Sequence, residues 1–103
     1  MRIIALSTLT TYSKRRPDAA KALVAWYSVV TSSTWRNAAD VKATYGNASI
    51  IDAERVVFNI AGNKHRLVVA INYRCAILFI KFIGNHVEYD RIDAANVQHG
   101  DHP

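Results

Sequence analysis

The stretch from Asn59 to Tyr73 limits the possible folds of this chain more than any other part of the sequence. Two apolar runs flank Gly62 and Asn63, and these residue types tolerate the positive φ angles of tight turns. The pattern predicts a β-hairpin. Three side chains able to engage a phosphate follow the turn directly: Lys64, His65 and Arg66. A small rigid sheet that presents cations at one end is suited to gripping a polyanion.

Length and charge narrow the class of protein. The chain has 103 residues, the size of one domain, and a formal net charge of +5. Such a charge favours nucleic acid or an acidic protein as partner, although a basic surface that only aids solubility would look the same. Cys75 is the only cysteine, residues 1–6 are too short for a signal-peptide core, and no apolar run reaches membrane-spanning length. We therefore expect a cytoplasmic protein without membrane contact.

The periodicity of the chain changes from helical to extended near residue 50. Residues 2–6 predict a short strand before the helices. The helix boundaries are expected at residues that cap or start helices: Ser7 or Thr8, Pro17, and Asn37 or Asp40. Strands follow at Val56–Ile60, Arg66–Tyr73 and Ala76–Ile83. A strand, helices and then an antiparallel meander predict an α+β domain over residues 1–95, with a flexible C-terminal tail over residues 96–103.

The hairpin turns predict which side chains share a face of the sheet. Asn59 should lie opposite Arg66, Arg66 opposite Ile83, and Val68 opposite Lys81. One face is then apolar and should pack on the helices: Phe58, Ile60, Leu67, Val69, Ile71, Tyr73, Leu78, Ile80 and Phe82.

The other face is expected to be exposed and to gather polar side chains at one end. Asn59, Arg66 and Lys81 meet there, and the chain after Gly84 can return over them. Arg74 is eight residues from Arg66, about 27 Å at the rise of a strand, so the two arginines cannot serve one phosphate.

Several short motifs together resemble the HigB toxin family of the RelE-like superfamily. They are Arg16–Ala19, Leu23 with Trp26 and Tyr27, Trp35, Phe58–Val68 and Gly84–Asp90. The resemblance implies a RelE-like α+β toxin of a type II toxin–antitoxin system, with a short N-terminal strand and helices packed on an antiparallel sheet. It implies cleavage of mRNA in the A site of the 30S ribosomal subunit and neutralisation by a HigA-type antitoxin. Operator DNA would be reached only through that antitoxin.

The resemblance also implies a reaction without a metal or cofactor, in which a 2′-hydroxyl attacks the adjacent phosphate. Arg66 is the candidate for binding the phosphate, because its planar fork can hold two oxygens; the alternative is an arginine that only extends from a strand end. His86 is the candidate for proton transfer, or else it caps a turn. Tyr89 could act as a base, stack on a nucleobase, or be structural. Lys81 is the candidate for neutralising the charge of the phosphate, because a lysine that interrupts an apolar strand is less easily explained as an ordinary surface residue. The histidines and Cys75 have no metal-ligand spacing.

Further residues are candidates for binding RNA: Asn59, Lys64, Arg74, Asp90, Lys14, Arg15 and Arg16. The cluster at residues 14–16 could contact ribosomal RNA, dock an acidic antitoxin segment, or be a solvated run of charge. Lys64 could equally be solvated. Asp90 is unusual beside RNA, and either orients Arg66 or His86 or is an ordinary surface acid. The sequence leaves two other functions open: a non-catalytic RNA- or ribosome-binding module of the same fold, and a ribonuclease that acts without ribosomes.

Overall fold

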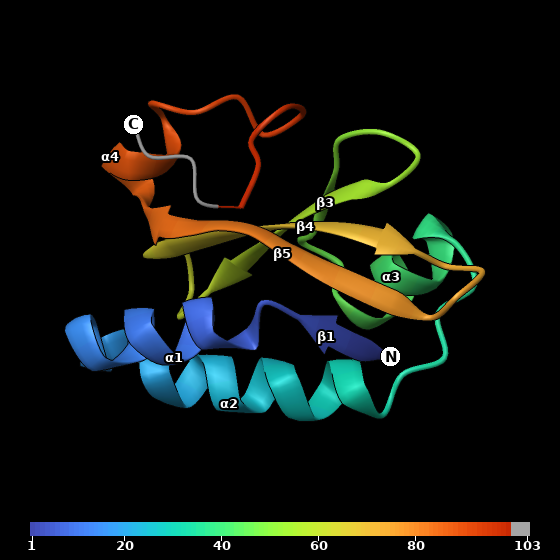
Figure 1. Cartoon of the computed structure of the whole chain (residues 1–103), viewed down its shortest axis with the longest axis horizontal. Helices are drawn as coiled ribbons and strands as arrows, with labels where there is room; N and C mark the ends of the chain where they lie inside the picture. The colour runs from blue at the N-terminus through green and yellow to red at the C-terminus, as the bar shows by residue number, and fades with distance from the viewer. Residues whose placement is uncertain (100–103) are drawn as a thin grey trace.

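A computed structural model describes residues 1–99 of the chain. Its centre is a five-stranded sheet with the strand order β1-β5-β4-β3-β2 (Figure 1). The strands are β1 (Arg2–Ile4), β2 (Ser49–Ile50), β3 (Arg55–Ile60), β4 (His65–Asn72) and β5 (Ile77–Asn85). The helices are α1 (Leu6–Arg15), α2 (Pro17–Thr31), α3 (Ala38–Thr44) and α4 (His86–Tyr89). The predicted α+β class is confirmed.

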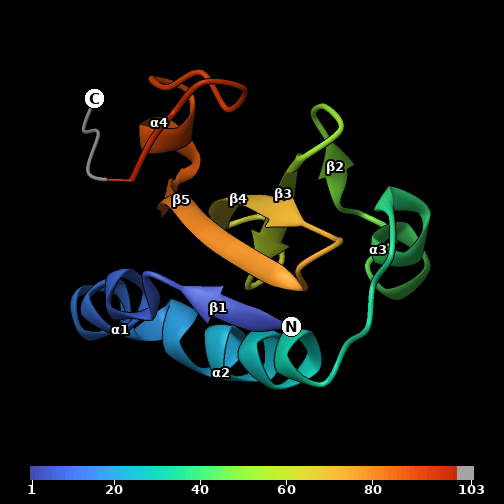
Figure 2. The ribbon, with the colours of Figure 1, turned by 45° about the vertical axis from the view of Figure 1, so that its right-hand side comes forward.

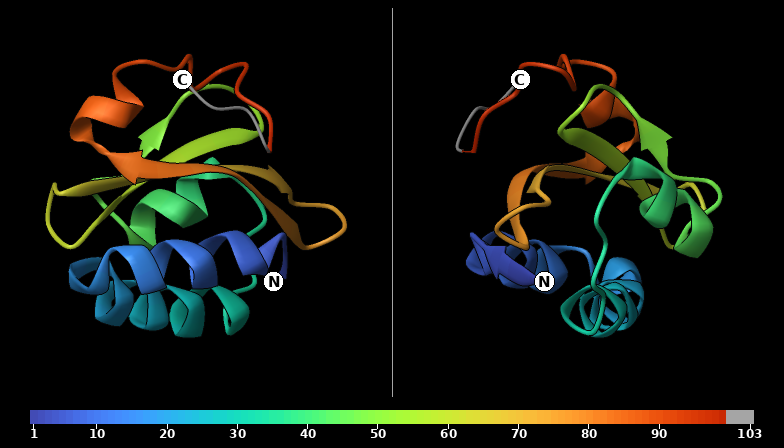
Figure 3. Two further views of the ribbon diagram at one scale, coloured as in Figure 1. Left: turned by 60° about the vertical axis from the view of Figure 1, so that its left-hand side comes forward. Right: turned by 90° about the vertical axis from the view of Figure 1, so that its right-hand side faces the viewer.

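The helices and the C-terminal segment cover opposite faces of the sheet. Helices α1 and α2 form a hairpin under one face, whereas α4 and the chain after it lie over the other (Figures 1 and 2). A view from the side shows these three layers with α3 at the edge of the sheet (Figure 3). Strand β1 pairs in parallel with β5, so the sheet is mixed, while the three long strands form the predicted antiparallel meander. Within the described residues, no helix combines the length and apolar character needed to cross a membrane.

Local sequence signals placed most helix boundaries correctly. Pro17 begins α2, and the side chain of Asn37 caps α3 by accepting a hydrogen bond from the Asp40 amide at 3.0 Å. The N-cap expected at Ser7 or Thr8 is wrong. Helix α1 follows Ala5, which has a φ of 71° and makes no side-chain cap. Ala5 is the one residue between β1 and α1, and its backbone is in the left-handed region.

The predicted pairing is confirmed for the first hairpin and wrong for the second. Asn59 lies opposite Arg66, as expected. Arg66, however, lies opposite Gly84 rather than Ile83, because Lys81 is an extra residue at a β-bulge. The bulge moves Phe82 out of the helix-facing layer and into a second cluster with Val57, Val68, Ala94 and Val97.

The second face of the sheet is therefore not exposed where it was expected to be. Val57 and Val68 are both buried, and the residues that cover them come from the C-terminal segment. Arg55 holds this segment in place, since its guanidinium donates to the carbonyl oxygens of Ala94, at 3.2 Å, and Val97. Val97 belongs to the predicted tail and is buried, so this residue contributes to the core, whereas Asn96, Gln98 and His99 are exposed. The rest of that predicted tail, residues 100–103, lies outside the described residues.

Replacing Arg55 by Met should lower the free energy of unfolding by about 2–4 kcal/mol, because two buried carbonyl oxygens lose their donor. Urea unfolding measures the loss, and hydrogen exchange of the amides in residues 94–99 should accelerate more than exchange in β4. Arg55→Lys keeps one charged donor and should give an intermediate loss. Unchanged exchange in residues 94–99 would show that Arg55 does not hold this segment.

Candidate active site

The ends of β3, β4 and β5 bring three of the predicted site residues around Arg66. Its Nη1 donates to Asn59 Oδ1, and its Nη2 lies 3.5 Å from His86 Nε2. The guanidinium carbon lies 5.7 Å from the centroid of the Tyr89 ring, within range of a cation–π contact. Arg66, His86 and Tyr89 thus form one group of side chains, with Asn59 as the support for the arginine.

The backbone around Arg66 is built to allow this approach. Gly84 lies opposite Arg66, and a Cβ added there would lie 2.7 Å from Phe82 Cζ and 2.9 Å from Glu88 Cβ. A side chain at position 84 would therefore push α4 away from the sheet. Glycine at this position lets the short helix start directly at the end of β5 and places His86 beside Arg66.

Asn85 fixes the start of α4. Its side chain accepts from the Glu88 amide, and the Glu88 carboxylate accepts from the Asn85 amide, both at 2.9 Å. This is a capping box, which satisfies two backbone donors that the first turn of a helix leaves open. The spacing of Asn85 and Glu88 is its sequence signature, and it could have predicted α4 before the structure was known.

Lys81 lies on the same face of the sheet but makes other contacts. Its ammonium donates to Gln98 Oε1 at 3.1 Å and lies 5.6 Å from the centroid of the Phe79 ring. Gly84, which pairs with Arg66, comes three positions after Lys81, so about 10 Å of strand separates their backbones. Lys81 thus flanks the Arg66 group instead of joining it.

The remaining RNA-binding candidates spread over two ends of the molecule. Lys64 is exposed in the β3–β4 turn, next to the Arg66 group, and Asp90 is exposed directly after α4. Arg74 is exposed in the β4–β5 turn, at the far end of β4 from Arg66, as the strand length predicts. Lys14 and Arg15 are exposed in the last turn of α1, whereas Arg16 is half-buried and forms an ion pair with Glu88 at 3.0 Å.

His65 does not present its ring to a ligand, although its position after the turn suggested a phosphate contact. It is 3% exposed, and both ring nitrogens have partners: Tyr12 Oη at 2.6 Å and Asp18 Oδ2 at 2.8 Å. The reason is the alternation of side chains along a strand, which puts His65 on the same face as Leu67, toward the helices. That alternation was the signal in the sequence that could have excluded His65 from the phosphate-binding set.

Burial and hydrogen bonds shift the pKa values of three groups that support the site. Burial raises the pKa of Tyr12 above its ordinary value. Burial alone would also raise the pKa of Glu88, but hydrogen bonds from Arg16 and the Asn85 amide, with the charges of Arg16 and Arg15, bring it below its usual range. The hydrogen bond from His65 lowers the pKa of Asp18. Glu88 and Asp18 are therefore ionised at neutral pH.

The lowered pKa of Glu88 predicts that α4 loosens in acid. A carboxylate whose pKa is depressed by folding stabilises the protein above its unfolded pKa, which is about 4.3, and this stabilisation is lost as the pH falls through the folded pKa. Amide spectra of Asn85–Glu88 between pH 6 and pH 3 should follow that loss. Glu88→Gln should remove this part of the pH dependence, and identical pH dependence of stability in the variant and the wild type would contradict the prediction.

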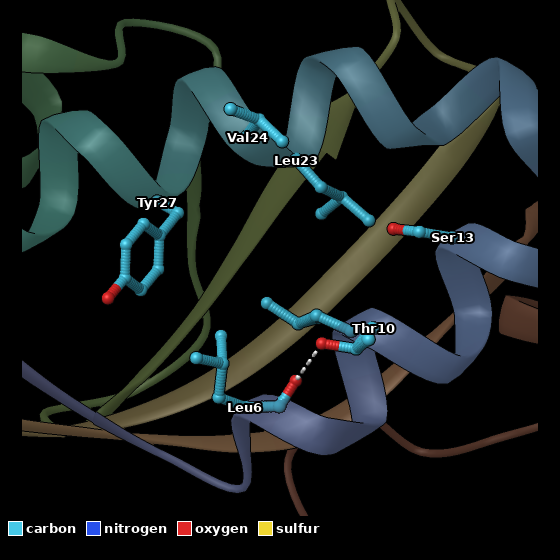
Figure 4. Close-up of a pocket in the computed structure, with 7 residues that line it drawn as sticks. Leu6, Thr10, Ser13, Leu23, Val24 and Tyr27 are labelled. Atoms are coloured by element: carbon cyan, nitrogen blue, oxygen red, sulfur yellow. Dashed lines mark hydrogen bonds between the residues drawn. The ribbon is translucent and has the colours of Figure 1, made fainter.

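An apolar groove on the helical hairpin is distinct from the Arg66 group. Its lining comes from α1 and α2, with Leu6, Val24 and Tyr27 partly exposed along it (Figure 4). Its lining residues include none of the predicted catalytic ones. Among residues 1–99, no three His, Cys, Asp or Glu side chains gather closely enough to hold a metal ion.

Comparison with known proteins agrees with the arrangement of these elements. A family model described as HigB toxin, the RelE-like toxic component of a toxin–antitoxin system, matches residues 19–92. The chain is also 26% identical over 94 residues to the mRNA interferase HigB of Escherichia coli O6:H1 (strain CFT073), covering 89% of this chain and 91% of that protein. The matched range contains β3, β4, β5 and α4, and with them the whole Arg66 group. This chain is a member of the HigB toxin family, the RelE-like toxic components of toxin–antitoxin systems.

Proposed function

We propose that this protein is an endoribonuclease that cleaves mRNA and so inhibits translation. The observation that carries the proposal is the Arg66 fork, which is held by Asn59 on one side and lies 3.5 Å from His86 on the other. Arg66 is only half-buried, so part of its side chain remains open to a ligand. The name of the Escherichia coli relative, mRNA interferase, is consistent with RNA as the substrate.

The reaction that fits these side chains is attack of a 2′-hydroxyl on the adjacent phosphorus. The new bond joins the 2′-oxygen to phosphorus, and the bond from phosphorus to the 5′-oxygen of the next nucleotide breaks. The products are a 2′,3′-cyclic phosphate and a 5′-hydroxyl. One proton leaves the 2′-hydroxyl and one reaches the 5′-oxygen, and neither transfer needs a metal or a cofactor.

The roles follow from the chemistry of each side chain. Arg66 stabilises the charge that builds up on the non-bridging oxygens, because guanidinium binds phosphate through two parallel hydrogen bonds. His86 is exposed beside it and transfers a proton, since imidazole exchanges protons near neutral pH. The Tyr89 ring stacks on a nucleobase or takes part in proton transfer. Lys81 and Lys64 hold the flanking phosphates, and Asp90 orients the cations.

Other basic side chains would extend the contact beyond the scissile bond. Lys14 and Arg15 lie exposed at the end of α1, and the next residue, Arg16, donates to Glu88. We infer that this end of the molecule contacts ribosomal RNA when the toxin acts in the A site of the 30S subunit. Arg74, at the opposite end of the sheet, would make a separate contact. Such phosphate contacts make binding depend on salt concentration.

We further propose a cytoplasmic protein whose antitoxin is of the HigA type. The family is defined as the toxic component of a toxin–antitoxin system, so a neutralising partner is part of its description. A net charge of +5 suits an acidic segment in that partner. Co-expression with the protein encoded by the adjacent gene, followed by co-purification, tests this assignment directly.

The proposed activity is tested by cleavage of a defined mRNA, once as naked RNA and once on translating ribosomes, with and without a metal chelator. The expected result is cutting of the ribosome-bound message, with 2′,3′-cyclic phosphate ends, in the presence of the chelator. Cutting of naked RNA at the same rate would make the protein a ribosome-independent ribonuclease. Binding to ribosomes without any cutting would instead identify a non-catalytic module.

A further inference from the structure

Five side chains outside the Arg66 group connect the helical hairpin to α4, the short helix that begins at His86. They are Asp18, His65, Tyr12, Arg16 and Glu88, which we call the Tyr12 network. Tyr12 Oη lies 2.6 Å from His65 Nδ1, and His65 Nε2 lies 2.8 Å from Asp18 Oδ2. One nitrogen of Arg16, Nη1, lies 3.0 Å from Tyr12 Oη and 3.0 Å from Glu88 Oε1. The network therefore spans residues from α1, α2, β4 and α4.

The partners decide the direction of the hydrogen bonds at both ends of this network. The Asp18 carboxylate only accepts, so His65 Nε2 carries its proton. With a neutral imidazole, Nδ1 accepts from the Tyr12 hydroxyl, whose oxygen in turn accepts from Arg16. Arg16 also donates to Glu88. Every one of these donors then meets an acceptor, and Tyr12 is the central link of the network.

Two members of the network, His65 and Glu88, adjoin the Arg66 group. His65 precedes Arg66 in β4 and pairs with Asn85 in β5. Glu88 closes the capping box with Asn85, the residue before His86. The network thus supports the backbone next to Arg66, through His65, and next to His86, through Glu88 and Asn85. Its own side chains bind one another.

We propose that Tyr12 is a positioning residue for the proposed RNA cleavage: through Arg16 and Glu88 it sets the distance between His86 and Arg66. The expected effect on the cleavage rate rests on the proposed function. The positioning of His86 relative to Arg66 does not. Arg16, which the sequence suggested as an RNA contact, links Tyr12 to Glu88. Tyr12 itself does not touch the substrate.

Tyr12→Phe tests the proposal, because it removes only the hydroxyl that joins His65 to Arg16. Tyr73→Phe is the matched control, since the Tyr73 hydroxyl is also buried but has no hydrogen-bond partner within the described residues. Tyr12→Phe should lower the rate of cleavage per folded molecule about 10- to 100-fold with little change in KM, as expected when a reacting group is misplaced. Tyr73→Phe should cut at the wild-type rate.

The second variant is Glu88→Gln, which keeps an acceptor for the Asn85 amide but loses the charge that pairs with Arg16. Its loss of rate should not add to that of Tyr12→Phe, because both changes break one network. Additive losses, or a Tyr12→Phe rate equal to that of Tyr73→Phe, would overturn the proposal.

A spectroscopic measurement separates this proposal from the proposed function. The ring resonances of His86, identified by their loss in His86→Asn, should shift in Tyr12→Phe and in Glu88→Gln but not in Tyr73→Phe. If the wild type cuts no RNA and these shifts occur, the proposed function fails while the positioning of His86 by Tyr12 stands. If the wild type cuts RNA and no shift occurs, the positioning role fails alone.

Discussion

Replacing Arg66 by Ala is expected to slow RNA cleavage by about 10²- to 10³-fold, the usual effect of removing one group that stabilises developing charge. The physical reason is that Arg66 lies 3.5 Å from His86, whereas Lys81 contacts Gln98 and Phe79, and Lys64 lies exposed in a turn. The measurement is the single-turnover rate on ribosome-bound mRNA. Ribosome affinity should fall only slightly, since the other basic residues remain.

The matched variant for this prediction is Arg66→Lys. It keeps the positive charge but loses the planar fork that reaches Asn59 and His86 together, so we expect most of the rate to be lost here too. If Arg66→Lys cuts as fast as the wild type, charge alone is sufficient and the fork geometry has no role. If Arg66→Ala cuts as fast, the proposed site is wrong.

Replacing Phe58 by Ala is expected to lower the free energy of unfolding by about 3–5 kcal/mol, a large share of the stability of a domain of this size. Phe58 is 1% exposed and lies between three other aromatic rings. Their centroids lie 5.5 Å away for Trp26, 6.1 Å for Trp35 and 5.3 Å for Tyr45. This cluster joins α2 and the chain around α3 to β3, so its loss removes contacts between three elements. Urea unfolding measures the change.

Phe79→Ala provides the comparison on the same sheet. Phe79 is half-buried on the opposite face, so its removal should cost about 1 kcal/mol, less than half of the loss at Phe58. Equal losses at the two positions would contradict the view that the helix-facing layer carries most of the stability. Phe58 directly precedes Asn59, whose side chain contacts Arg66. Stability and RNA cleavage of the Phe58 variant should therefore be measured on the same preparation.

The sequence predicted the parts of the fold that depend on local chemistry. The turn at Gly62 and Asn63, the helix start at Pro17 and the cap at Asn37 each depend on residues a few positions apart. The alternation of apolar residues along β4 correctly assigned Leu67, Val69 and Ile71 to the helix-facing core. The pairing of Asn59 with Arg66 followed from the same turn, and that pairing places the supporting amide of the candidate site.

The sequence could not predict where one residue breaks the alternation. The bulge at Lys81 shifts Phe82 to the other face and puts Gly84, not Ile83, opposite Arg66. Nothing in the alternation of β5 marks the bulge, because the strand is apolar on both faces. The second face is buried only because Ala94 and Val97 return to it, some 40 residues after Arg55 in the chain.

What the sequence alone determined is the order of elements, the first hairpin and the presence of Arg66 and His86 at one end of the sheet. Their environment was decided by the tertiary structure, since Tyr12 and His65 are 53 residues apart and Arg16 and Glu88 are 72 apart. Such pairs have no local signal: their hydrogen bonds form only after the helical hairpin packs on the sheet and removes them from water. The alternation of β4 turns His65 toward the helices, and packing then supplies the partners of its ring, Tyr12 and Asp18.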